Sequence, residues 1–252
     1  MAILGRFSDA RLFMGGYNMS GLTNNITLAY NTNLLDCTVM GNATKISIAG
    51  LTDYSITASG HMPTTSAADL TEKVLFDQVG GVAIPFTVMP GPAPAEGSRA
   101  FFFEAVQATH TYGAAHGALL PYNITGQSAD SGYPMIRGYV VEPGATARTG
   151  AASPFISTGS NALGAIAANE YLYAVLHVTA VDTPTTLDIT IQNDDAADFA
   201  GADTVATFTT VTTGVGSQYI ARVPGPFTDT YWRCNAVIVG TSYTFAIAIG
   251  KA

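Results

Sequence analysis

The sequence predicts a mainly β protein: a β-sandwich or barrel with one flanking α-helix, followed by a second all-β unit. Three patterns indicate this class. Apolar residues alternate with Thr, Ser and Asn in several segments, as they do in half-buried strands. Gly, Asn and Asp separate these segments in combinations that make tight turns. Apolar positions three and four residues apart, which are typical of a helix, are clear in one segment.

The first expected strands lie near the N-terminus. Apolar residues recur at every second position in residues 26–30, 46–48 and 54–58, and small or polar residues lie between them. Gly41–Asn42 and the segment Ala49–Asp53 provide the turns between these strands. Strands with one apolar and one polar face favour an antiparallel sandwich or barrel.

One helix is expected near residues 66–79. Ser66 begins it and Asp69 follows three positions later, an arrangement that satisfies free N–H groups at a helix N-terminus. Leu70 and Val74 share one face of this helix, so we expect them to pack on the first β unit. A pair of glycines then ends the helix.

The rest of the chain is expected to complete one β unit and then to form another. Residues 1–145 make the first unit, which includes strands at 101–112 and 135–143. Residues 146–170 are small, polar and weakly periodic, which favours a connector or an extended arm. Residues 171–252 make the second unit. Its expected strands cover residues 171–181, 186–194, 204–212, 217–223, 231–240 and 242–250.

The composition favours a protein that is buried against copies of itself. Charged residues make up 11% of the 252 residues and hydrophobic residues 48%. Charged residues are roughly 25% of a typical soluble domain. A chain with so few charges either covers its surface with Thr, Ser, Asn and Gly or buries much of it in an assembly. The net charge of −8 argues against a protein that grips nucleic acid, which needs Lys and Arg against the phosphates.

Neither a secretory signal nor membrane insertion is expected. A Gly and an Asp interrupt the first residues where a signal peptide has its apolar core. No apolar run reaches the ~18 residues of a spanning helix.

No group of residues predicts catalysis, a metal or a cofactor. His110 and His116 lack further ligands at a useful spacing. The carboxylates of Asn193–Asp198 lack the Gly and the final Glu of an EF-hand, and they fit a turn. Cys37 and Cys234 are isolated thiols that we expect to be small buried side chains. The chain is therefore not expected to be an enzyme, and a cell-wall hydrolase would need an acid or a metal that is not evident.

An ordered set of short motifs runs from Met19 to Met62 and into the helix. Its members are Ser20–Gly21, Leu35, Asp36, Thr38, Gly41, Gly50, Leu51, Asp53, Ser59–Gly60 and a helix from Ala67. In order and spacing these motifs resemble the N-terminal region of the major tail tube proteins of long-tailed, siphovirus-type bacteriophages. The sequence departs from that pattern at Cys37, Met40 and Asn42, where the family usually has Thr, Phe and Asp.

The resemblance implies a structural protein of the virion. Tail tube proteins are β-sandwiches that join side by side into rings, with a continuous β wall around a lumen and loops that reach the next ring. The stacked rings form a conduit for genome ejection. The resemblance makes Asp36, Gly41, Gly50, Asp53 and Gly60 turn or inter-ring positions. For the two aspartates, capping of a local turn is an equal alternative.

The resemblance also implies the partners and the location. The partners are further copies of the chain, other tail proteins at the tube ends, and viral DNA that passes through the lumen without specific binding. Two β units favour a trimeric ring that imitates a hexamer over a true hexamer, and residues 171–252 are then a second tube unit rather than a decoration domain. The expected location is the virion tail, after assembly in the cytoplasm of the bacterial host.

A lumen through which DNA slides should be acidic or neutral, since fixed cations would bind phosphates. Glu104 and Asp188 alternate with apolar residues on expected strands and are the lumen candidates, although an outer-surface position is equally compatible. The alternative function is a head-decoration or receptor-binding β-sandwich protein, which would expose pockets instead of forming tubes.

Overall fold

The computed structural model describes residues 9–63, 66–91, 93–150, 155–156, 163–212 and 214–252. In this part the chain is mainly β, with thirteen strands and one helix, α1 (Ser66–Asp77), which confirms the predicted fold class. The strands are β1 (Arg11–Met14), β2 (Tyr17–Asn18), β3 (Thr23–Asp36), β4 (Ser47–His61), β5 (Ile84–Met89), β6 (Arg99–Tyr112), β7 (Pro121–Ser128), β8 (Ile136–Pro143), β9 (Phe155–Ile156), β10 (Tyr171–Asp194), β11 (Asp203–Thr207), β12 (Gly216–Pro224) and β13 (Tyr231–Lys251). None of the described helical residues belongs to a helix long and apolar enough to cross a membrane.

The chain divides into two compact units. Unit 1 contains residues 1–21, 84–104 and 136–252, and unit 2 contains residues 22–83 and 105–135. Unit 1 therefore takes residues from both segments, 1–145 and 171–252, that the sequence pattern assigns to successive units.

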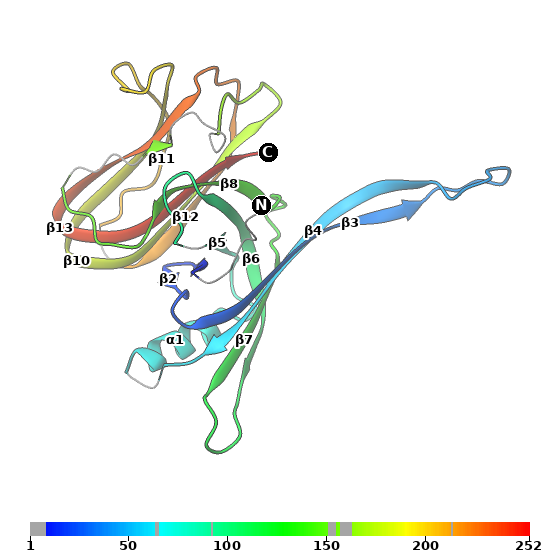
Figure 1. Cartoon of the computed structure of the whole chain (residues 1–252), viewed down its shortest axis with the longest axis horizontal. Helices are drawn as coiled ribbons and strands as arrows, with labels where there is room; N and C mark the ends of the chain where they lie inside the picture. The colour runs from blue at the N-terminus through cyan, green and yellow to red at the C-terminus, as the bar shows by residue number, and fades with distance from the viewer. Residues whose placement is uncertain (1–8, 64–65, 92, 151–154, 157–162, 213) are drawn as a thin grey trace, which may run out of the picture. The chain divides into compact units, whose positions relative to one another are not determined.

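Unit 1 is built around the antiparallel pair β10–β13 (Figure 1). This ladder runs from Leu172 opposite Lys251 to Asp194 opposite Tyr231. β11 and β12 also pair with β10, while β8 and β9 pair with β13. Alternate residues of β10 and β13 are apolar and buried, so the same pattern that predicts strands also supplies the core of the unit.

β10 and β13 are each a single long strand where the sequence pattern predicts two. β10 covers the predicted strands 171–181 and 186–194, and β13 covers 231–240 and 242–250. The register shifts between Pro184 and Thr186, so the expected turn is a bulge inside a continuous strand. The segment 171–252 consequently holds four strands and not six.

The described part of residues 146–170 contributes to the core of unit 1. Leu163 and Ile166 are buried, and Ile166 makes a β-bridge with Phe227. Trp232 is fully buried and donates a hydrogen bond of 2.8 Å from Nε1 to the Gly164 carbonyl. Residues 151–154 and 157–162, which belong to the expected connector, lie outside the described residues.

Two polar contacts, each with a buried member, lie within unit 1. Both ring nitrogens of His177 are engaged: Nε2 lies 2.7 Å from Thr87 Oγ1, and Nδ1 lies 2.6 Å from the Gly15 carbonyl oxygen. Burial lowers the pKa of His177 to about 4, so the ring is neutral near pH 7. The second contact is an ion pair, in which Arg148 Nη2 lies 2.6 Å from Oε2 of the buried Glu142.

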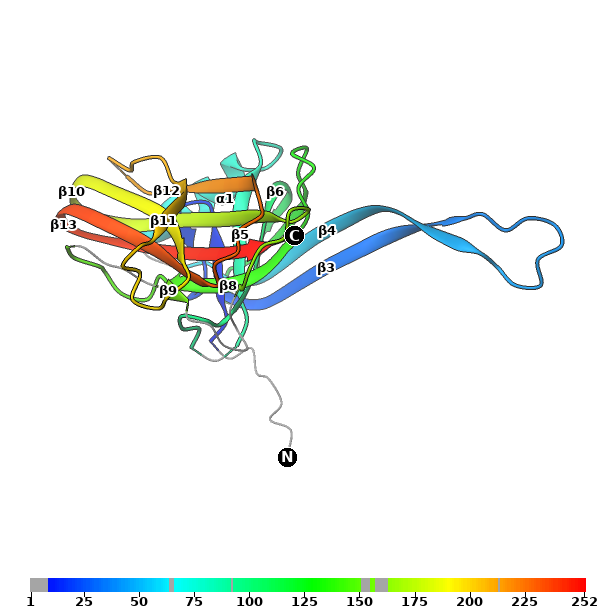
Figure 2. The same cartoon turned by 90° about the horizontal axis from the view of Figure 1, so that it is seen from above.

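Unit 2 is a sheet in the order β3, β4, β7 and the second half of β6. β4 pairs with β3 along its length but with β7 only from Ser55 to His61. Beyond this region β3 and β4 continue as a two-stranded ribbon with no third strand beside it (Figures 1 and 2).

Helix α1 ends at Asp77, close to the predicted end, and Gly80 adopts a φ of 68° after it. Among the described side chains of the helix, Leu75 is buried and Val74 is half-buried. The backbone carbonyl of Leu75 accepts a hydrogen bond of 2.7 Å from Gln107 Nε2, which attaches the helix to β6 within unit 2. The side chain of Leu70, the other predicted packing residue, lies outside the described side chains.

Candidate interaction surface on the β3–β4 arm

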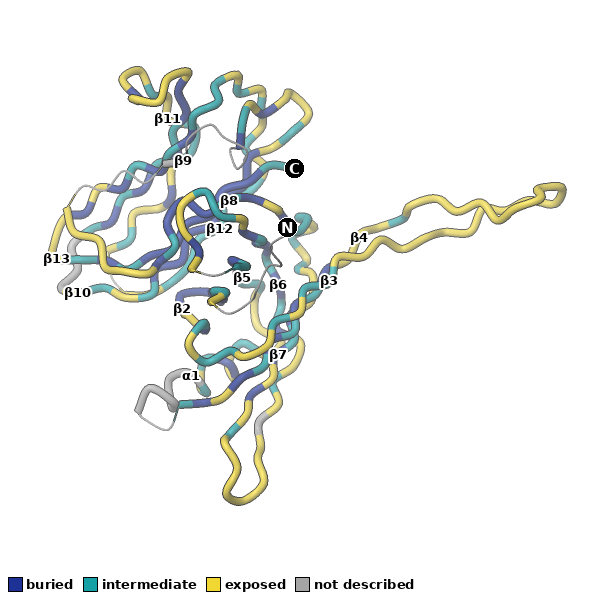
Figure 3. Tube along the Cα trace, in the orientation of Figure 1, coloured by how far each residue is buried: buried dark blue, intermediate teal, exposed yellow. Residues whose placement is uncertain are grey.

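The far part of the β3–β4 hairpin, residues 31–53, is called the arm here. Its register pairs Asn31 with Asp53 near the sheet and Asp36 with Ser47 near the tip. Figure 3 shows the arm as exposed along almost its whole length, and among its residues only Gly50 is even half-buried. A two-stranded ribbon is marginally stable by itself in water. We therefore expect contact with another surface to stabilise the arm.

Apolar side chains are numerous on the arm. Seven large ones are exposed: Leu34, Leu35, Val39, Met40, Ile46, Ile48 and Leu51. Met40 at the tip is exposed to the full extent of a free side chain, and Leu51 is 87% exposed. Large apolar side chains that are exposed together on one segment are typical of interaction sites in soluble proteins.

The tip of the arm is held in shape by Asp36. Its Oδ1 accepts a hydrogen bond of 3.0 Å from the Thr38 N–H, and its Oδ2 lies 3.3 Å from Lys45 Nζ. The hydrogen bonds from Thr38, with a further contribution from Lys45, lower the pKa of Asp36 below its usual value. Residues 37–44, between the two charged partners, carry no charge. The arm thus presents a neutral loop.

Two of the motif glycines fit the backbone of the arm. Gly41 adopts a φ of 99° in the tip turn, where Asn42 N donates to the Val39 carbonyl oxygen at 3.3 Å. A side chain is strained at this φ, which explains Gly at this position. At Gly50, an added Cβ would lie 3.0 Å from the Asn33 carbonyl oxygen, because the ladder is irregular here.

The base of the arm is fixed by Asp53 and Gly60. Asp53 Oδ1 accepts a hydrogen bond of 2.7 Å from Ser128 Oγ, at the end of β7. At Gly60, an added Cβ would lie 1.9 Å from the Leu22 carbonyl oxygen, so only Gly allows the chain to pass this closely. The same carbonyl accepts a hydrogen bond of 2.9 Å from the His61 N–H.

All five predicted motif positions therefore lie on one hairpin. Asp36 and Gly41 shape the tip, Gly50 lies along the arm, and Asp53 and Gly60 secure the base. Their predicted inter-ring role stays a prediction. The predicted alternation did not single out five of the exposed residues, Leu34, Leu35, Val39, Met40 and Leu51, and the only local signal near them is the absence of charge in residues 37–44.

The lumen candidates lie outside the arm, and one of the two cysteines is exposed where a buried side chain was expected. Glu104 on β6 and Asp188 on β10 are both half-buried, and Asp188 accepts a hydrogen bond from the Thr210 hydroxyl. Their orientation toward a lumen stays a prediction. Cys234 is buried as expected, but the expectation for Cys37 is wrong, because it lies on the exposed arm.

The described His, Cys, Asp and Glu residues form no group of three that could hold a metal ion. In the carboxylate-rich turn after β10, Asp194 Oδ1 accepts a hydrogen bond of 3.1 Å from the Ala196 N–H, and its Oδ2 accepts one of 3.2 Å from the Gly201 N–H. These bonds cap the turn, as the sequence pattern favoured over a calcium loop.

Comparison with known proteins gives weak structural similarity only. No protein-family model matches the chain, and no curated protein matches it in sequence. Among solved structures, it is similar to a chain in the virion of a native gene transfer agent particle, with 14% identity and a TM-score of 0.41 over 50% of this chain and 95% of that one. It is also similar to a chain from the tail of an empty gene transfer agent particle with C6 symmetry, with 16% identity and a TM-score of 0.40 over 51% of this chain and 95% of that one. A third similar structure is the SPP1 Dit protein, described as a hub of the adsorption apparatus, with 9% identity and a TM-score of 0.38 over 96% of this chain and 99% of that one. These values are too low to assign the chain to a family.

Proposed function

We propose that the chain is a structural protein of a bacteriophage tail that polymerises into stacked rings and forms a tube for genome ejection. The observation that carries this proposal is the β3–β4 hairpin: its arm is exposed and carries seven large apolar side chains and a neutral tip loop, and all five motif positions of the tail tube resemblance lie on the hairpin. The partner that buries the arm is another copy of the chain.

Strand edges support self-association as well. Among the described residues β3 pairs only with β4, so the outer edge of a strand of 14 residues is open. Open edges with apolar side chains pair readily with other chains, and a closed ring satisfies every such edge. The low charge of the whole chain agrees with a surface that is largely covered in the assembly.

The tube would conduct DNA through electrostatics rather than binding. The net charge of −8 supports a lumen that repels phosphates, with Glu104 and Asp188 as the candidate lining residues. The predicted preference for a trimeric ring of two-unit chains over a hexameric ring stays a prediction, and the division of the chain, in which residues 171–252 share a unit with residues 84–104 and 136–145, adds no support to it. Assembly would take place in the host cytoplasm, with other tail proteins closing the tube ends.

The test combines assembly with thiol accessibility. Purified protein at increasing concentration is examined by sedimentation and negative-stain microscopy, and rings or tubes are expected in the absence of DNA. Cys37 on the arm reports burial, because Cys234 is inaccessible. A maleimide should label Cys37 in dilute monomers and should fail to label it in assembled particles.

A comparison of an arm variant with a control variant tests whether the arm is the assembly surface. Leu34→Asp combined with Leu51→Asp places charges on the exposed arm, which should abolish assembly without loss of thermal stability. The control is Val82→Asp, at an apolar residue of unit 2 that is 80% exposed but lies off the arm, and it should assemble normally. A wild-type chain that remains monomeric at high concentration contradicts the proposal. Discrete trimers that never stack would favour the decoration or receptor-binding alternative.

A further inference from the structure

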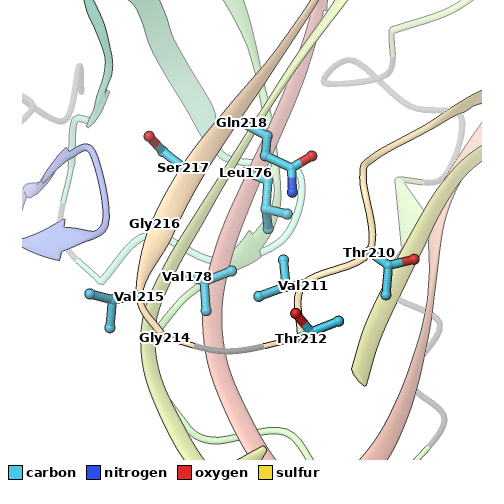
Figure 4. Close-up of a pocket in the computed structure, with 10 residues that line it drawn as sticks. All are labelled: Leu176, Val178, Thr210, Val211, Thr212, Gly214, Val215, Gly216, Ser217 and Gln218. Atoms are coloured by element: carbon cyan, nitrogen blue, oxygen red, sulfur yellow. The ribbon is translucent and has the colours of Figure 1, made fainter. Parts of the chain in front are cut away.

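A cavity of about 210 Å³ opens in unit 1 between β10, β12 and the loop that precedes β12 (Figure 4). Leu176 and Val178, both buried residues of β10, contribute to it, and Val211 lies opposite them. Val215 at the loop is 46% exposed, so apolar surface continues outward from the cavity. None of the residues that line the cavity is charged.

Two of the four polar side chains that line this cavity make hydrogen bonds within the chain. Gln218 accepts a hydrogen bond from the Thr209 N–H and donates one to the Thr209 carbonyl, each 2.7 Å long. The Thr210 hydroxyl donates to the Asp188 carboxylate. Thr212 and Ser217 add hydroxyl groups, so the lining is neutral and mixed, and Leu176, Val178 and Val211 supply the apolar part that an aliphatic side chain would contact.

The size of the cavity argues for a side chain rather than a small-molecule ligand. Sites for drug-sized ligands usually measure about 300–1,000 Å³ and contain a few placed polar groups. A space of about 210 Å³ with neutral walls suits one or two aliphatic side chains. These features favour, as the occupant, a protein segment with an exposed apolar residue on a neutral loop.

The arm tip meets these requirements. Met40 is fully exposed at the end of a narrow ribbon, and the loop from 37 to 44 is uncharged. The two nearest charges, Asp36 and Lys45, are paired with each other and do not need to enter the cavity. Met is unbranched and has three rotatable bonds, so it fills irregular spaces well.

We propose that Met40 of one copy inserts into the β10–β12 cavity of another copy. This inference rests on the proposed self-assembly, and it names the two surfaces through which the copies would touch. The tip and the cavity are different surfaces of the chain, so the contact is head-to-tail, and it propagates from copy to copy until it closes a ring or extends a tube.

Disulfide mapping tests the contact directly. Wild-type protein, which carries Cys37, is mixed with a Cys37→Ser, Thr212→Cys variant whose new thiol lies at the exposed rim of the cavity. Every 37–212 disulfide in this mixture joins two copies. Mild oxidation of the assembled mixture should give a reducible dimer. In the matched control, wild type is mixed with a Cys37→Ser, Thr228→Cys variant, whose new thiol lies at an exposed residue away from the cavity. This mixture should give no 37–228 disulfide.

Substitution of Met40 supplies a second readout. Met40→Asp should raise the concentration needed for assembly at least about tenfold, whereas Met40→Leu should leave it nearly unchanged. Assembly by Met40→Asp at the wild-type concentration, with no 37–212 dimer, overturns this contact while the proposed tube still stands. Monomeric behaviour of wild-type protein at every concentration overturns the proposed function itself. A 37–212 dimer together with the loss of assembly in Met40→Asp supports both.

Discussion

Ser128 donates a hydrogen bond of 2.7 Å to the Asp53 carboxylate at the place where β4 loses β7 as its neighbour. Ser55 is the last residue of β4 with a β7 partner, so Asp53 lies just inside the two-stranded ribbon. This contact fixes the end of the sheet and the start of the arm.

Removal of this hydrogen bond should loosen the arm locally. Ser128→Ala and Asp53→Asn should each speed amide hydrogen exchange in residues 47–54 and leave the core of unit 1 unchanged, because the contact is exposed and local. The double variant should exchange no faster than either single variant, since both remove one interaction. Additive effects would mean that the two residues act separately.

Gly60→Ala should destabilise the fold by about 3 kcal/mol, because the new Cβ would overlap backbone and not a movable side chain. Denaturant unfolding measures this loss. Gly21→Ala is the control, because an added Cβ there has no atom within 4 Å, and it should change stability little. Equal stability of the two variants would contradict the close approach at Leu22.

Acid should weaken unit 1 through His177. The folded-state pKa of about 4 lies below the ordinary value of 6.5, so the unfolded chain binds a proton between these values and the folded chain does not. Stability from this group is therefore complete above pH 6.5 and is lost as the pH falls toward 4. The expected loss between pH 7 and pH 5 is about 2 kcal/mol. His177→Gln should flatten this part of the stability profile, and an unchanged profile would contradict the assignment.

The Glu142–Arg148 pair should respond unequally to loss of each partner. Arg148→Ala leaves a buried carboxylate without its cation and should cost about 3 kcal/mol, whereas Glu142→Gln leaves an arginine that is 43% exposed and should cost less. Unfolding free energies of both variants at pH 7 give the comparison. A larger loss in Glu142→Gln would reverse this account.

The two cysteines should differ sharply in reactivity. Cys37 is exposed, whereas burial raises the pKa of the Cys234 thiol. A thiol reagent should modify one group per folded monomer and two per unfolded chain. Cys37→Ser should abolish labelling of the folded protein, and any remaining label would place Cys234 within reach of solvent.

Local patterns in the sequence predicted the local elements well. α1 begins at Ser66 as its capping pattern indicates, and the alternation at Tyr54, Ile56 and Ala58 correctly marks buried positions of β4. The same alternation could not reveal that Ile48 is exposed, because exposure depends on where β7 ends. Alternation reports a strand, whereas burial depends on partners that lie far away in the sequence.

The length of β10 and the division of the chain into units also depend on distant partners that local patterns do not reveal. Pro184 has the signature of a turn, yet it lies in a bulge of β10 because β13 provides a continuous partner on the other side. The pairing of β13 with β8 brings residues 136–143 into the same unit as residues 231–251, and nothing local marks this pairing. The arm was predicted as a set of motifs, but its exposed apolar side chains emerged only with the structure.

The place of β13 between β10 and β8 sets an order of events during synthesis of the chain. All residues of unit 2 leave the ribosome before β13 is made, so the arm can form while unit 1 still lacks its central strand. At ~5–20 residues per second, this interval lasts about ten seconds. During that time the edge of β8, and later that of β10, lacks its β13 partner, and the nascent chain has an arm but no completed unit 1. Under the proposed contact between copies, a stalled or truncated product would carry the arm without a completed unit 1, and it would cap a growing assembly without extending it.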